Sequence, residues 1–207
     1  HLGISLRSFR SEKLSGFVKA LLDGNMVVAL KMCEMIREEY PIVLTRELER
    51  AKDWVKRKAR GTERYGLLAS AEGKRLRGVG IQVASEIDHV GWNGKEHVNS
   101  SYYLEVPASE FKVQGLDIDY ALLAWDADFR YIDGDFEYYR FRGTKWNHIH
   151  QERRKKYLKN AYRVLLTRAR QGLVIFIPQG DLNDATRRPE YYDGTYNYLR
   201  RIGICEI

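Results

Sequence analysis

The chain has 207 residues, of which 44% are hydrophobic and 30% charged. This length and hydrophobic content suffice for one proper core, and they predict a single domain over residues 1–207 in place of two. No apolar stretch approaches the roughly 18 residues of a membrane span, so we expect a soluble, cytoplasmic protein with no membrane partner. The 35 basic against 28 acidic residues, a net charge of +7, suit a polyanionic partner.

The first predicted helix, Ser11–Leu22, carries apolar residues at helical spacing. The segment Leu6–Glu12, at its start, contains the repeat Arg-Ser-Phe-Arg-Ser, which includes Arg7 and Arg10. A serine and a glutamate in this segment can cap the start of the helix, with the arginines incidental. The alternative is that the arginines face a ligand.

The next elements alternate between helix and strand. The pattern predicts a helix at Val27–Glu39, a strand at Pro41–Thr45, a helix at Arg46–Arg60 and strands at Tyr65–Ser70 and Tyr102–Val106. Basic residues concentrate in Lys52–Arg64, in Lys74–Arg77 and in Arg153–Arg170. Such charge runs are typical of a solvated face, and they also suit a nucleic-acid partner.

A polar segment, Ala108–Asp119, precedes the predicted strand Tyr120–Asp126. Within it, Gln114 offers donors and an acceptor, Gly115 lets the backbone approach a ligand closely, and Asp117 can accept from a hydroxyl or position a cation. On its own, the run Gln-Gly-Leu-Asp could equally form an ordinary turn.

The segment Phe129–Arg142 alternates apolar and polar residues around Asp133-Gly134, which predicts a β-hairpin. Its aromatic rings could stack on unpaired bases, as rings displayed on strands do elsewhere, or they could pack on the domain. The candidates for base stacking are Tyr138, Tyr139 and, close behind the hairpin, Trp146.

A predicted helix at Glu152–Arg168 is followed by a turn and a buried strand at Leu173–Pro178. On a helical wheel the apolar residues share one face, Arg163 and Arg170 point away from it, and Arg168 falls at its edge. A cation at the edge of a buried face can be held rigidly at a crevice, as charge stabilisation in phosphoryl transfer requires. From the wheel alone, the three arginines could instead be solvated.

With a final helix at Glu190–Ile202, the elements predict an α/β fold. The expected architecture is a mainly parallel sheet with helices on both faces and a small β-hairpin insertion. Because ligands on such sheets bind at the carboxyl ends of the strands, we expect the site there.

The run Tyr162–Arg170, YRVLLTRAR, resembles motif VI of superfamily I helicases, in which the arginine of a Thr-Arg-Ala core reaches the γ-phosphate of ATP. The resemblance implies that Arg168 is a catalytic arginine finger. Ala108–Asp119 resembles motif V of the same helicases, and Leu6–Glu12 resembles motif IV. The ATP-binding residues that this resemblance implies are Arg7 or, in the other register of the repeat, Arg10, together with Gln114, Gly115, Asp117 and Arg168.

Four further segments are similar to the Schlafen-like group III DNA/RNA helicase family of bacteria: Tyr65–Arg77, Ser101–Val106, Trp125–Tyr131 and Tyr192–Tyr196. The resemblance covers nearly the whole chain and implies the second, C-terminal RecA-like motor domain of such a helicase. It also implies single-stranded or duplex nucleic acid as a partner, with Arg163 and Arg170 as candidate contacts beside the hairpin rings.

The sequence contains no Gly-x-x-x-x-Gly-Lys-Ser/Thr loop and no apolar strand that ends in Asp-Glu. In the family these parts bind most of the ATP and Mg²⁺, and they belong to a preceding N-terminal RecA-like domain. We therefore expect this chain to be the C-terminal part of a longer protein, to work against that domain, and to be inactive as an ATPase by itself.

Two alternatives from other functional classes stay open. One is a basic nucleic-acid-binding α/β module that uses no ATP. The other is a nuclease built on Asp117, Asp119 and Asp126, although no lysine stands at a spacing that completes a nuclease motif. Cys33, Cys205 and the five histidines show no recognised ligand spacing, so no metal site is expected.

Overall fold

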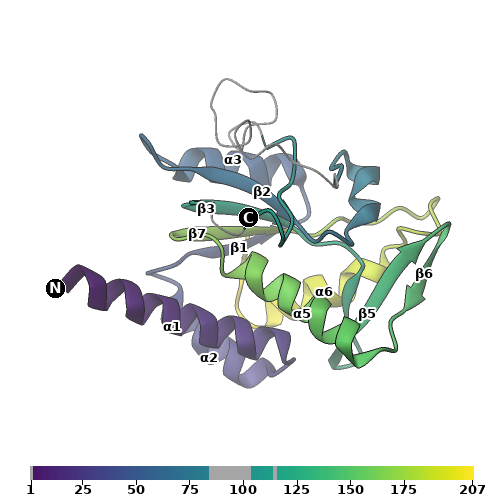
Figure 1. The fold of residues 1–207 in the computed structure, drawn as a ribbon, viewed down its shortest axis with the longest axis horizontal. Helices are drawn as coiled ribbons and strands as arrows, with labels where there is room; N and C mark the ends of the chain where they lie inside the picture. Colours follow the sequence, from purple (N-terminus) through teal and green to yellow (C-terminus); the bar gives the residue numbers. More distant parts are fainter. Residues whose placement is uncertain (1, 84–103, 114–115) are drawn as a thin grey trace.

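The computed structural model of the chain describes residues 2–83, 104–113 and 116–207, with side chains from Ser11 onward. Its centre is a parallel sheet of five strands in the order β2-β3-β7-β1-β8 (Figure 1). These strands are β1 (Ile42–Thr45), β2 (Tyr65–Ala69), β3 (Tyr120–Ala124), β7 (Gly172–Phe176) and β8 (Cys205–Glu206). The predicted α/β class with a mainly parallel sheet is confirmed.

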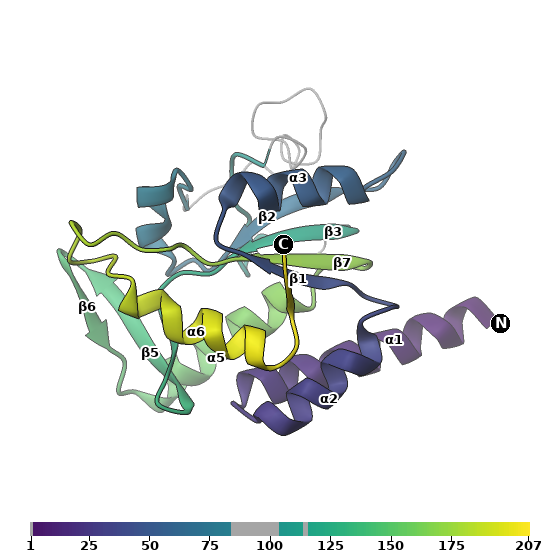
Figure 2. The same cartoon turned by 180° about the vertical axis from the view of Figure 1, so that it is seen from behind.

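Helices cover both faces of this sheet (Figures 1 and 2). On one face lie α1 (Leu2–Leu22), α2 (Met26–Ile36), α5 (Glu152–Leu166) and α6 (Glu190–Arg201). On the other lies α3 (Leu48–Lys58), and the short 3₁₀ helix η1 (Lys74–Val79) adds Leu76 to the same apolar cluster. Within the part of the chain described, no helix is both long and apolar enough to cross a membrane.

The central strand shows why the strands are apolar without interruption. In β3, Ala121 and Leu123 join the cluster beneath α1, α5 and α6, while Leu122 and Ala124 join the cluster beneath α3. All four side chains are fully buried. A parallel sheet covered on both faces requires apolar side chains at every position, so the strand pattern is continuous instead of alternating.

Several helix boundaries differ from the prediction, and two of them concern the motif-like segments. Helix α1 begins at Leu2, before Ser11, because residues 4–10 contain neither glycine nor proline and can extend the helix. The motif IV segment therefore lies within α1 and not ahead of it. Helix α5 ends at Leu166, before Arg168, because Thr167 occupies the C-cap and its Oγ1 donates to the Arg163 carbonyl oxygen at 2.8 Å.

One predicted strand, Tyr102–Val106, is wrong over its described part. Leu104–Val106 form turn and loop, and Leu104 has a φ of +53° that a regular strand does not accommodate. The described segment that follows it pairs with β2 through a single parallel bridge, between Leu68 and Ala108. Tyr102 and Tyr103 lie outside the described residues.

The predicted hairpin is confirmed and is part of a three-stranded antiparallel sheet. Its strands are β4 (Phe129–Ile132), β5 (Asp135–Arg142) and β6 (Lys145–His148). Asp133 and Gly134 form the two-residue turn with φ values of +49° and +100°, the left-handed conformation that this kind of hairpin turn requires. β6 was not predicted as a strand.

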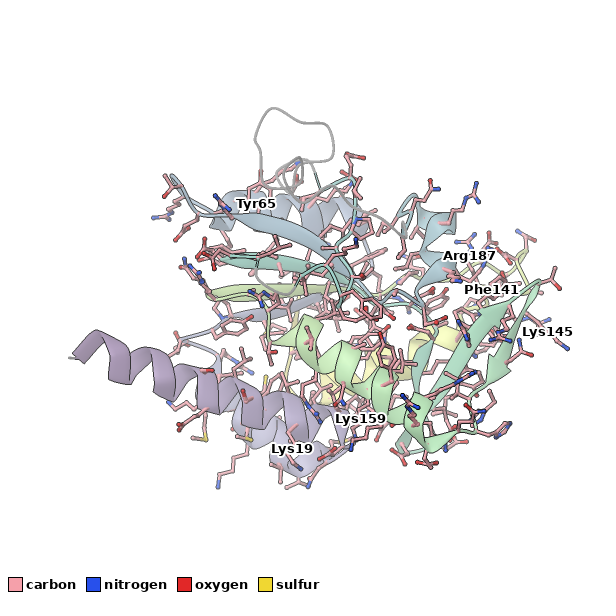
Figure 3. The ribbon with its side chains drawn as sticks, in the orientation of Figure 1. Lys19, Tyr65, Phe141, Lys145, Lys159 and Arg187 are labelled. Atoms are coloured by element: carbon pink, nitrogen blue, oxygen red, sulfur yellow. The ribbon has the colours of Figure 1, made fainter. Side chains whose placement is uncertain are left out.

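The three-stranded sheet lies beyond the carboxyl ends of the parallel strands and packs on α6 (Figure 1). The backbone nitrogen of Tyr131 donates to Thr195 Oγ1 at 2.9 Å, and the Tyr131 and Tyr198 rings stack with centroids 3.9 Å apart. Figure 3 shows Phe141 and Lys145 at the outer end of this sheet, close to Arg187. The amino ends of the parallel strands lie on the opposite side of the molecule.

Candidate functional site

A pocket of about 480 Å³ opens at the amino edge of the parallel sheet. It is bounded by α1, by Tyr40 shortly before β1 and by the loops that precede β3 and β7. Its lining residues are Ser11, Leu14, Tyr40, Asp119 and the run Thr167, Arg168, Ala169, Arg170 and Gln171. We call it the Arg168 pocket.

Backbone hydrogen bonds hold the two loops of the Arg168 pocket side by side. Arg170 N donates to the Ile118 carbonyl oxygen at 3.0 Å, and Gln171 N donates to that of Asp119 at 2.8 Å. On the other side, the buried Tyr40 hydroxyl donates to the Ala169 carbonyl oxygen at 3.1 Å. The segments that resemble motifs V and VI are therefore neighbours in space.

The guanidinium of Arg168 is fixed by the motif V loop. Its Nε donates to the carbonyl oxygen of Leu116 at 3.1 Å, and its Nη2 donates to the same oxygen. Nη1 makes no hydrogen bond to any residue that the structure describes. The side chain is half-buried in the pocket wall, so a permanent planar cation is held in a fixed orientation there.

Four polar residues around Arg168 form two interacting pairs. Asp117 forms an ion pair with Arg170, and both side chains are more than half exposed. Asp119 accepts from Arg64 N at 2.9 Å and from Gln171 Nε2 at 3.2 Å. Asp119 and Gln171 were not predicted as parts of a nucleotide site. The signal that could have found them is their position directly before the apolar runs of β3 and β7.

The Arg168 pocket lies at the opposite edge from the one that the sequence predicted. Asp119 immediately precedes β3 and Gln171 immediately precedes β7, so both belong to loops at the amino ends of the strands. The expectation of a site at the carboxyl ends is wrong for these residues. The reason is that the motif residues precede their strands, whereas the general rule concerns loops that follow them.

The other predicted nucleotide-binding residues are described only in part. Gln114 and Gly115 lie outside the described residues, as do the side chains of Arg7 and Arg10. The backbone of both arginines is helical, and Ser11, the residue after Arg10, lines the Arg168 pocket. The middle of α1, where Ser11 and Leu14 lie, is therefore adjacent to the segments that resemble motifs V and VI.

The family model described as Schlafen group 3, DNA/RNA helicase domain, matches residues 1–179. The chain belongs to this family. No curated protein and no solved structure matches the chain. The matched span of this Schlafen group 3 domain includes the Arg168 pocket and the whole three-stranded sheet, and it ends before α6 and β8. Membership in a helicase family is consistent with interaction with nucleic acid.

The aromatic residues of the hairpin make many contacts within the helicase domain. The Arg130 guanidinium lies 4.0 Å from the centroid of the Tyr139 ring and 5.1 Å from that of Trp146. Trp146 Nε1 donates to the Thr186 carbonyl oxygen at 2.8 Å. Tyr138 is half-buried, with its ring centroid 5.2 Å from that of Phe129. Base stacking by these rings stays a prediction.

Two buried carboxylates follow β3 at the carboxyl edge of the helicase domain. Asp126 accepts from Arg75 N at 2.8 Å and from the Tyr192 hydroxyl at 3.1 Å, and Asp128 accepts from the Tyr162 hydroxyl at 2.6 Å. Burial raises the pKa of both, and burial together with the nearby charge of Asp126 raises the pKa of Asp128 to about 7. The groups that donate hydrogen bonds to the two carboxylates all belong to the domain itself, which indicates a structural role.

The acidic residues named for a nuclease do not meet. Asp126 lies at the carboxyl edge of the sheet, while Asp117 and Asp119 lie at the amino edge beside the Arg168 pocket. Among the residues described, no group of three or more histidine, cysteine, aspartate or glutamate side chains could hold a metal ion. The arrangement gives the nuclease alternative no support.

Proposed function

We propose that this Schlafen group 3 domain is the second, C-terminal RecA-like motor domain of an ATP-dependent DNA or RNA helicase or translocase. In this proposal the N-terminal RecA-like domain of the same protein holds most of the ATP and its Mg²⁺. The present chain contributes motifs IV, V and VI to the facing wall of the nucleotide crevice. Arg168 is the proposed arginine finger.

The observation that carries the proposal is the fixed guanidinium of Arg168 in a pocket built from the two motif-like loops. Its Nε and Nη2 both donate to the carbonyl oxygen of Leu116. This anchor sets the direction in which Nη1 points. A cation placed before the reaction stabilises developing phosphate charge without any cost of reorganisation. The pocket volume of about 480 Å³ is in the usual range for small-molecule sites.

The remaining proposed roles concern binding and not chemistry. Asp117, with Gln114 and Gly115, is proposed to contact the nucleotide from the motif V loop, and Arg7 or Arg10 from α1. One oxygen of Asp117 accepts from Arg170 in this structure, and its other oxygen remains for a hydroxyl group. Arg163, Arg170 and the hairpin rings Tyr138 and Tyr139 are the proposed nucleic-acid contacts, whereas the contacts of Trp146 with Thr186 and Arg130 favour a packing role for that ring.

The proposal that this domain supplies only one wall of the ATP site is tested by comparing ATP turnover by this chain with turnover by the full-length protein. We expect no turnover by the 207-residue chain, with or without single-stranded DNA or RNA, because it has no phosphate-binding loop. The full-length protein should turn over ATP. Turnover by the isolated chain in the ordinary enzymatic range, about 1 to 1000 per second, contradicts the proposal.

A further inference from the structure

A pair of aromatic rings lies exposed on the surface of the domain. Phe111 is 60% exposed, and Tyr157, on α5, is 45% exposed. The two ring centroids are 5.9 Å apart, with 29° between the ring planes, which is a stacked arrangement. A contiguous exposed aromatic surface, unlike a single exposed residue, is a candidate for an interaction site.

A buried carboxylate fixes the position of this ring pair. Glu110, only 5% exposed, accepts from the Tyr157 hydroxyl at 3.1 Å and from Ala71 N at 3.0 Å. It thereby ties the residue before Phe111 both to α5 and to the loop after β2. Burial, followed by the Glu110 charge, raises the pKa of Tyr157, so the hydroxyl remains a donor. The ring pair is thus a braced platform.

Three cations without an ion-pair partner in the described part of the chain line a cavity beside this platform. The cavity has a volume of about 610 Å³, and Phe111 forms part of its wall together with Lys74, Arg77 and Lys112. None of these three cations makes an ion pair with a residue that the structure describes. No carboxylate is among the described residues that line the cavity. Lys74 and Arg77 come from η1, so the positive charge is held near the ring by a short helix.

We propose that Phe111, braced by Tyr157, is a stacking platform for a base of single-stranded nucleic acid, and that Lys74, Arg77 and Lys112 bind the adjoining phosphates. The choice of nucleic acid as the ligand rests on the proposed function. Every unpaired base offers a flat face to an exposed ring, and the phosphates of a single strand match unpaired cations. A duplex offers no free base faces except at its ends.

The hairpin rings differ from Phe111 in the groups that already contact them. Tyr139 lies under the Arg130 guanidinium, and Trp146 donates to the Thr186 carbonyl oxygen. Phe111 has only the Tyr157 ring as an aromatic partner among the residues described. The face that is most available to a base therefore belongs to Phe111.

The proposal is tested by titrating this chain with a fluorescent oligothymidine and with an abasic strand of the same length. Replacing Phe111 by alanine should weaken binding of the oligothymidine about 5- to 150-fold, the range expected for one stacked base. Phe111→Trp should retain the affinity, because it keeps an aromatic face. Binding of the abasic strand should be the same for Phe111→Ala and for the unmodified chain, since no base is present to stack.

Two matched controls separate stacking and phosphate binding from general effects. Leu182→Ala removes an apolar side chain that is 85% exposed and lies outside the cavity, and it should leave the affinity unchanged. Lys74→Glu should weaken binding of both strands. It should also reduce the slope of log affinity against log salt concentration by the amount expected for the loss of at least about one phosphate contact. Lys31→Glu, the same change at an exposed lysine on α2 outside the basic runs, should have a much smaller effect.

Oligothymidine affinity for Phe111→Ala within twofold of the unmodified chain overturns the platform. So does a chain that binds no single strand at all, or one whose binding of the abasic strand falls as much as that of the oligothymidine. None of these outcomes affects ATP turnover by the full-length protein, so the proposed motor function is judged separately. Equal melting temperatures of Phe111→Ala and the unmodified chain establish that the exposed ring is not needed for folding.

Discussion

The side chain of Arg168 is anchored on the main chain of Leu116. Two nitrogens of its guanidinium donate to the one carbonyl oxygen, the first at 3.1 Å, across 52 residues of sequence. The residue that resembles the motif VI arginine is therefore positioned by the loop that resembles motif V. Any movement of the motif V loop changes the direction of the guanidinium, because one oxygen holds both nitrogens.

The ion pair between Asp117 and Arg170 should contribute little to stability. Both side chains are more than half exposed, so Asp117→Asn should change the free energy of unfolding by less than about 1 kcal/mol. If Asp117 contacts the nucleotide as proposed, the same variant of the full-length protein should show a raised KM for ATP with kcat nearly unchanged. Denaturant titration and steady-state kinetics measure the two effects.

Glu47→Gln is the matched control for Asp117→Asn, since it removes an ion pair with Arg50 in which both side chains are more than half exposed, outside the lining of the Arg168 pocket. It should change neither stability nor KM. A loss of more than about 2 kcal/mol of stability in Asp117→Asn is outside the range of an exposed pair and contradicts the surface role.

Asp128 should make the stability of the domain depend on pH. The pKa of this buried carboxyl is raised from an ordinary value of 3.8 to about 7, so between these values the folded state holds a proton that the unfolded state has lost. The free energy of unfolding therefore falls as pH rises through this window, and it levels off above the folded pKa. Asp128→Asn has no proton to lose at this position. Relative to Asp128→Asn, the unmodified chain should be more stable at pH 5 than at pH 8.

The measurement for Asp128 is denaturant unfolding of both proteins across that pH range. Because only the difference between them is used, groups whose pKa does not depend on Asp128 cancel, and what remains is the titration of Asp128 with its neighbour Asp126. A difference that is constant with pH, or that grows in favour of the unmodified chain as pH rises, shows that Asp128 is ionised in the folded protein.

Trp146 should act mainly through packing. Trp146→Ala removes the hydrogen bond from Nε1 to the Thr186 carbonyl oxygen and the ring near the Arg130 guanidinium. The loss should be on the order of 1 to 3 kcal/mol of stability, visible as a lowered melting temperature. Affinity for a single-stranded oligonucleotide should stay within about twofold, far less than the loss of a stacked base. Lost affinity at an unchanged melting temperature instead supports base stacking by this ring.

The sequence predicted the regular parts of the fold well. Long periodic segments such as Glu190–Ile202 and the apolar runs of β3 and β7 correspond to the observed elements, because burial on two faces leaves a strong pattern. The Asp133-Gly134 turn was predicted because aspartate followed by glycine tolerates the positive φ values that this kind of hairpin turn needs. Local chemistry is sufficient for features of this kind.

The sequence did not predict which segments would meet. Asp119 and Gln171 lie at the amino edge of the sheet because the motif-like loops precede β3 and β7. The general rule for α/β sheets concerns loops that follow the strands, so it predicted the carboxyl edge. The platform at Phe111 was also missed, because exposure of one phenylalanine depends on the contacts of Glu110 with α5 and with the loop after β2. Long-range contacts of this kind leave no local pattern.

Lysine should not replace arginine at residue 168 in supporting ATP turnover. Arg168→Lys keeps a positive charge but lacks the planar fork with which arginine bonds to the Leu116 oxygen and to a phosphate at the same time. In the full-length protein, we expect this variant to lose nearly as much ATP turnover as the alanine variant. Recovery of most of the activity by lysine shows that charge alone is sufficient and that the anchoring to Leu116 is unimportant.

The most direct measurement is single-turnover ATP hydrolysis by the full-length protein with Arg168→Ala, against Arg201→Ala as a control at an exposed arginine of α6. An arginine finger predicts a rate reduced on the order of 10³-fold or more, with unchanged nucleic-acid affinity and melting temperature, while Arg201→Ala keeps the full rate. A fall of less than about tenfold, equivalent to under about 1.4 kcal/mol of transition-state stabilisation, contradicts the assignment of Arg168.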